Sequence, residues 1–177
     1  MRIWNRVFTG LFIVVVTISG FFSWNYEEVV RYEIKSGENL AGANLGGKNL
    51  VGIDLHATDL SGAYMYGANL AGANLAGSNL AGANLAGANL AGANLAGANL
   101  AGANLVDTIM NKAKLQKANL TNAELGGASL INANLAGANL AGANLFGTDL
   151  TGANLLNTLY TDAHLEGATM PNGEIHP

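Results

Sequence analysis

Residues 68–105 repeat the pentapeptide Ala-Asn-Leu-Ala-Gly with one exception, Ser78, and without a change of frame. Carried outward, this frame places an apolar residue at every fifth position from Leu40 to Met170, which makes 27 centres, of which 23 are Leu. On an α-helix, positions five apart are rotated by about 140°, so the leucines would not form a stripe. Each glycine inside a helix would also cost about 1 kcal/mol. The period therefore excludes a helix over this stretch.

Polar and apolar positions alternate within one repeat. The Ala two positions before the centre and the centre Leu share one parity, so both are predicted to face inward. The Asn and the residue after Leu are then predicted to face outward. Gly at the fifth position, as at Gly72, gives the backbone the freedom to turn a corner. The sequence predicts a short bent strand followed by a corner, stacked on copies of itself.

These repeats resemble those of the pentapeptide-repeat family, as in Ala-Asn-Leu-Ala-Gly at 68–72 and Thr-Asp-Leu-Thr-Gly at 148–152. The resemblance covers about residues 38–172 and leaves a short tail at 173–177. It implies an all-β fold, a right-handed quadrilateral parallel β-helix with four pentapeptides in each coil and the centre Leu inside. On that geometry the repeats make about seven coils, and residues 20 apart lie above one another.

The first 24 residues read as a membrane or export segment. Residues 7–24 contain no charged side chain, two arginines precede them and two glutamates follow. Such a run lies near the lower limit for a membrane-spanning helix and above the usual length of a signal-peptide core. The arginines predict an amino end in the cytoplasm and an exported remainder. A signal anchor is favoured. A cleaved signal peptide, which would give a secreted protein, and a buried helix of a soluble protein are the alternatives.

Residues 25–37 are predicted to form a short helix between this segment and the repeats. Asn25 and Glu28 have the spacing of a capping box, and Gly37 is placed to end the helix. An uncovered β edge invites unwanted pairing, so we expect this helix to cap the first coil. The alternative is a simple linker beside the membrane.

Large outward residues interrupt the pattern on one face of the predicted rod. Tyr66, Val106 and Phe146 follow the centres of that face at alternate coils, and Tyr64 also points outward there. They predict a sparse stripe that contacts a protein partner. The alternative is scattered surface hydrophobes, which soluble proteins commonly carry.

A second interruption contains Lys112, Lys114 and Lys117. Three neighbouring lysines are able to contact an anionic lipid headgroup or an acidic partner. The alternative is a solvated patch that keeps the rod soluble.

The third interruption lies near the end of the repeats, where Leu156, Leu159 and Tyr160 interrupt the polar outward pattern. The residues after 170 are too few for a capping helix, so we predict a poorly covered edge. Two copies are then expected to meet there tail to tail, or a partner closes the edge.

No residue pattern indicates an enzyme, a metal site or a cofactor. His56 and His164 fall on different faces several coils apart, so they cannot share a metal ion. Asp54 and Asp59 occupy positions that the repeat fills with Asn or Asp interchangeably. The chain has no Cys, so it has neither disulfides nor thiolate metal ligands. Its formal net charge is only −4, and this mild acidic balance does not indicate binding to nucleic acid.

The resemblance also suggests candidate functions. Some family members are strongly acidic DNA mimics that inhibit topoisomerases, but this sequence lacks their dense acidic face and long dimerising tail. We expect a non-enzymatic structural or protein-interaction module, tethered to or exported across a bacterial membrane. If the source is cyanobacterial, the compartment is the periplasm or the thylakoid lumen. A DNA mimic and a membrane-associated assembly or transport factor are the alternatives.

Overall fold

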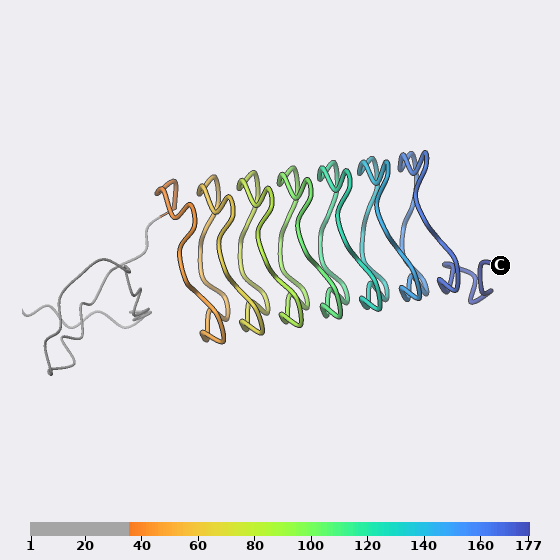
Figure 1. The fold of residues 1–177 in the computed structure, drawn as a ribbon, viewed down its shortest axis with the longest axis horizontal. Coiled ribbons are helices and arrows are strands. Elements are labelled where there is room, and N and C mark those ends of the chain that lie inside the picture. Colours follow the sequence, from red (N-terminus) through yellow and green to blue (C-terminus); the bar gives the residue numbers. More distant parts are fainter. Residues whose placement is uncertain (1–35) are drawn as a thin grey trace, which may run out of the picture.

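The computed structural model describes residues 36–177, which form a rod of stacked coils (Figure 1). Parallel bridges join each residue at the Asn position to the residue 20 further along, from Asn39 paired with Asp59 to Asp149 paired with Thr169. A coil therefore takes 20 residues, and four repeats give the rod four faces. The predicted strand is reduced to a single bridge residue between turns, and residues 36–177 contain no helix.

Backbone hydrogen bonds between coils hold the stack together. The N–H of Leu70 donates to the carbonyl of Asn89 at 2.7 Å, and the N–H of Asn89 donates back to the carbonyl of Ala68 at 2.9 Å. Within the corner, the N–H of Ala73 donates to the carbonyl of Leu70 at 3.0 Å. This pattern recurs along the rod. These hydrogen bonds pair most of the backbone N–H and C=O groups that are removed from water when the core is buried.

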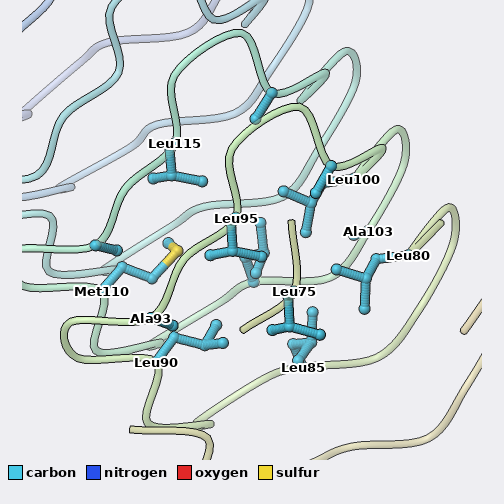
Figure 2. Packing of buried hydrophobic residues seen from close by; sticks show 14 of the residues in the cluster. Leu75, Leu80, Leu85, Leu90, Ala93, Leu95, Leu100, Ala103, Met110 and Leu115 are labelled. Carbon is cyan, nitrogen blue, oxygen red and sulfur yellow. The ribbon is translucent and has the colours of Figure 1, made fainter. Parts of the chain in front are cut away.

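The core is a set of leucine columns. Leu75, Leu95 and Leu115 come from successive coils and lie in line inside the rod (Figure 2). Leu95 and the inward Ala93 are fully buried, so the predicted inward positions are confirmed. Ser78, which breaks the repeat, is also buried, and its hydroxyl donates to the carbonyl of Leu75 at 2.8 Å. Ser78 thus adds a hydroxyl at a position that is usually Ala without leaving an unpaired polar atom.

The predicted N-terminal elements fall almost entirely outside the described residues. The membrane segment at 1–24 and most of the capping helix at 25–37 are not described, while Ser36 and Gly37 lie in a turn. Gly37 already follows the solenoid register, because its N–H donates to the carbonyl of His56 at 3.0 Å. Within residues 36–177, no helix is long and apolar enough to cross a membrane.

The C-terminal residues pack on the last coil instead of forming a separate tail. Ile175 pairs antiparallel with Thr169, and the N–H of His176 donates to the carbonyl of Ala168 at 2.8 Å. This short reversal covers one of the four faces of the edge. Residues 173–177, which the sequence predicts to be a short tail after the repeats, thus lie against the last coil.

The corners require a left-handed backbone. Most corner positions are Gly, such as Gly97 at φ +66°, but one coil has the four non-Gly corners Asp107, Lys112, Lys117 and Asn122 at φ between 55° and 60°. Asn and Asp tolerate this conformation better than most residues because their short side chains bond locally. The left-handed corner is thus a property of the fold and not of glycine alone.

This geometry predicts effects of different size for two substitutions at Gly97. A side chain there would point into open space, so only the backbone conformation opposes it. Gly97→Val is expected to lower the free energy of unfolding by about 1–2 kcal/mol or more, because a β-branched residue is strained at positive φ. Gly97→Asn is expected to stay within about 0.5 kcal/mol of the parent. Urea unfolding of both variants measures the difference, and equal losses would contradict the assignment.

Candidate interaction surfaces

One face of the rod carries large exposed side chains, and we call it the aromatic face. Its inward centres are Leu45, Met65, Leu85, Leu105, Leu125, Leu145 and Leu165. The residues that follow these centres form one outward column, which reads Gly46, Tyr66, Ala86, Val106, Gly126, Phe146 and Glu166. Tyr66 is 55% exposed and Phe146 is 63% exposed, whereas Val106 is half-buried. Large and small residues therefore alternate from coil to coil between Tyr66 and Phe146.

Two tyrosines lie next to each other near the N-terminal end of the aromatic face. The rings of Tyr64 and Tyr66 are stacked, with centroids 6.4 Å apart and an interplanar angle of 21°. A Cβ atom on Gly46 would lie 2.6 Å from Cε1 of Tyr64, so the ring occupies the space where that side chain would be. Gly46 is thus the residue that lets Tyr64 join the column. Sequence reasoning placed Tyr64 on this face but missed the role of Gly46.

Acidic residues surround Phe146 at the other end of the face. A shallow hollow beside its ring is lined by Glu124, Asn144, His164 and Glu166. The Asn144 side-chain amide donates to Oε2 of Glu124 at 2.8 Å and so orients that carboxylate. Sequence reasoning singled out Phe146 but missed these neighbours. The available signal was the replacement of the usual Asn at positions 124 and 164 of one column.

The three lysines lie on two successive corners and the position between them. Lys112 and Lys117 are corner residues at φ 60° and 58°, and Lys114 is a bridge residue between Asn94 and Asn134. All three are exposed, and no carboxylate lies within ion-pair distance of them in the described part of the chain. They form a small positive patch away from the aromatic face.

The last coil has an open edge on three faces. The N–H groups of Leu155, Tyr160 and Leu165 have no hydrogen-bond partner among residues 36–177, although their equivalents in earlier coils donate to the next coil. Leu156 and Leu159 are 66% and 60% exposed. Tyr160 stands at a centre position of the five-residue frame but is 52% exposed, because no further coil in the described residues covers it. A small apolar cavity reaches this end of the core.

An exposed acid and histidine meet on the first described coil. Nδ1 of His56 lies 2.9 Å from Oδ1 of Asp54, and the Asn74 amide donates to the same oxygen at 2.9 Å. The hydrogen bond from His56 is the largest cause that lowers the pKa of Asp54 below its ordinary value of 3.8. Sequence reasoning missed this pairing of His56 with Asp54. Residues 36–177 contain no group of three side chains that could hold a metal ion.

This pair gives a testable pH dependence. The folded pKa of Asp54 is lowered, so its contribution to stability is present above the unfolded pKa and is lost as the pH falls through the folded pKa. His56→Ala is expected to move the pKa of Asp54 back toward 3.8, because the strongest hydrogen bond to the carboxylate disappears. NMR titration of the Asp54 carboxyl carbon measures the shift. An unchanged pKa would contradict the pairing.

Comparison with known protein families shows which family the chain belongs to. The family model described as pentapeptide repeats (8 copies) matches residues 39–70, 68–105, 88–127 and 123–159. The chain belongs to the pentapeptide-repeat family. The match is to a family of non-enzymatic repeat modules, and no catalytic family is indicated.

Several solved pentapeptide-repeat structures are similar to this one. HetL from Nostoc sp. strain PCC 7120, involved in heterocyst differentiation regulation, is 29% identical over 80% of this chain and 89% of its own, with a TM-score of 0.41. A protein from the Arabidopsis thaliana thylakoid lumen is 32% identical over 65% of this chain and 66% of its own, also at 0.41. QnrB1, a plasmid-mediated fluoroquinolone resistance protein, is 18% identical over 72% of this chain and 84% of its own, with a TM-score of 0.31. No curated protein matches the chain.

Proposed function

We propose that this pentapeptide-repeat protein is a non-enzymatic interaction rod whose aromatic face contacts a protein partner. The supporting observation is the exposure of Tyr66 and Phe146, at 55% and 63%, on a surface whose other residues are mostly Asn, Ala and Gly. Aromatic residues are enriched among the side chains that contribute most to binding at protein interfaces. Lys112, Lys114 and Lys117 form a second contact, for an anionic group.

Photo-crosslinking in intact cells tests this function. A photoreactive phenylalanine analogue at position 146 is expected to give a discrete crosslinked product. The same analogue at position 96, a half-buried outward site on the opposite face, serves as the control and is expected to give none. No product at position 146, or the same product at both positions, would refute a partner on the aromatic face.

We also propose that residues 7–24 tether the rod to a membrane and that the repeats lie on the exported side. The support is the uncharged run and the arginines before it, which lie outside the described residues. Membrane fractionation with a carbonate wash tests the tether. Recovery of the intact protein in the cytoplasmic soluble fraction would refute it and favour the DNA-mimic alternative.

The open C-terminal edge supports a further proposal, that two copies meet tail to tail. Pairing would satisfy the free N–H groups of the last coil and cover Leu156, Leu159 and Tyr160. Sedimentation of the full chain is expected to show a dimer, and Leu159→Lys is expected to dissociate it. Ile109→Lys, at an exposed mid-rod bridge position, is the matched control. A monomer at high protein concentration would refute this association.

A further inference from the structure

We propose that the aromatic face binds a basic amphipathic helix of a partner protein, with the helix axis along the rod. This inference rests on the proposed function, because it names the kind of partner that the aromatic face contacts. Three properties of the face support the inference: the spacing of its side chains, the glycine corners beside them and the negative sign of its charges.

The column of large and small residues matches the repeat of a helix. Ala86 lies between Tyr66 and Val106, and Gly126 lies between Val106 and Phe146, so each small residue makes a notch between two larger ones. The notches are two coils apart, which is about 9.6 Å at the usual β spacing. Helix residues seven apart are separated by about 10.5 Å along the axis. Apolar side chains at helix positions i and i+7 therefore reach both notches.

The corners beside this column let a helix backbone approach closely. They are glycine at Gly47, Gly67, Gly87, Gly127, Gly147 and Gly167, with Asp107 the single exception on the aromatic face within residues 36–177. The other three rows of corners in the same range each contain at least two residues with side chains. Small residues allow helices to pack at short distances, and a row of glycines gives the same freedom here.

The charges of the face select a basic partner. Asp107, Glu124 and Glu166 are exposed beside the column, and the described part of the aromatic face has no Lys or Arg. The hollow at Phe146 lies between Glu124 and Glu166, so a cation there would contact both carboxylates and the exposed ring. Cations bind favourably over an aromatic face within about 6 Å. An anionic membrane or a nucleic acid would instead be repelled.

The opposite face lacks the column of alternating large and small side chains over most of its length. Its outward column reads His56, Ala76, Ala96, Gln116, Ala136 and Leu156, with no large apolar residue before the last coil. Ala96 therefore provides a matched control site for Ala86, because both follow a buried Leu and both are half-buried.

Binding of model peptides to the full chain tests the proposal. The probe is a fluorescein-labelled 21-residue helix of Leu and Lys, with Leu at i, i+3, i+4 and i+7, read by anisotropy. The control peptide has Glu in place of every Lys. We expect the Lys peptide to bind and the Glu peptide not to bind. Ala86→Trp, which fills a notch, and Phe146→Ser are each expected to weaken binding about tenfold or more.

Two further variants separate this surface from general attraction between opposite charges. Ala96→Trp is expected to leave the dissociation constant within about twofold of the parent. Glu124→Gln keeps an acceptor for Asn144 but removes the charge, so it is expected to weaken binding and reduce its salt dependence. Circular dichroism of each variant confirms that the rod remains folded.

The possible failures are distinguishable. Absent binding, equal binding of the Glu peptide, or equal weakening by Ala86→Trp and Ala96→Trp would each overturn the helix proposal. If the crosslink at position 146 still forms in cells, the interaction function stands and only the inferred partner class is wrong. If that crosslink is also absent, both proposals fail.

Discussion

Replacing Leu95 by Lys is expected to unfold much of the rod, whereas replacing its neighbour Ala96 by Lys is expected to leave it folded. Leu95 is fully buried between Leu75 and Leu115, while Ala96 is half-buried and points outward. Losing a buried leucine costs about 2–5 kcal/mol, and burying an unpaired ammonium group costs more. Native domains have only about 5–15 kcal/mol of stability in total. An outward substitution usually stays within about 0.5 kcal/mol.

Thermal unfolding of the full chain, followed by circular dichroism, measures this difference. Leu95→Met is the control, because Met65 and Met110 already occupy buried centres. A volume-conserving change of this kind costs less than about 1.5 kcal/mol. Similar midpoints for the two lysine variants would show that the inward and outward assignment is wrong.

Deleting residues 83–102 is expected to remove one coil without unfolding the rod. Bridges join residues 20 apart, so this deletion returns every later residue to an equivalent partner. The rod should shorten by about 4.8 Å, the spacing of adjacent strands. Because each coil contacts mainly its neighbours, stability should fall only by the share of one coil. Small-angle scattering measures the length, and loss of the folded state would contradict the prediction.

Deleting only residues 88–92 is expected to have a different effect. One repeat is a quarter of a coil, so the rod stays folded but every later residue moves to the neighbouring face. Phe146 then leaves the column of Tyr66. Spin labels at positions 66 and 146 report this rotation as a changed distance, and the Lys peptide should no longer bind to the variant. Unchanged label distances would contradict the four-faced register.

The register and the inward positions could be predicted from the sequence because the repeat is so regular. Once Leu recurs every fifth position, an inward Leu70 fixes an inward Ala68, and the family resemblance adds four repeats per coil. The positions of Tyr66, Val106 and Phe146 in one column follow from the same count.

Features that depend on contacts between individual side chains could not be predicted from the sequence in the same way. The stacking of Tyr64 on Tyr66 needs the absence of a side chain at Gly46, and the pair of Asp54 and His56 needs two outward side chains to turn toward each other. Such contacts are set by side-chain rotamers and by the neighbouring coil. The five-residue period predicts neither the side-chain rotamers nor the contacts with the neighbouring coil.

The five-residue period predicts the solenoid and its core, because hydrophobic periodicity selects which side chains are buried, and the family resemblance adds the four faces on which the unusual residues lie. The contacts that those residues make became known only from the folded structure. It placed Glu124, His164 and Glu166 around Phe146, and it folded Ile175 back against Thr169. The physical reason is that these contacts join residues from different coils or the two sides of a chain reversal. They form only when the backbone has already brought those residues together.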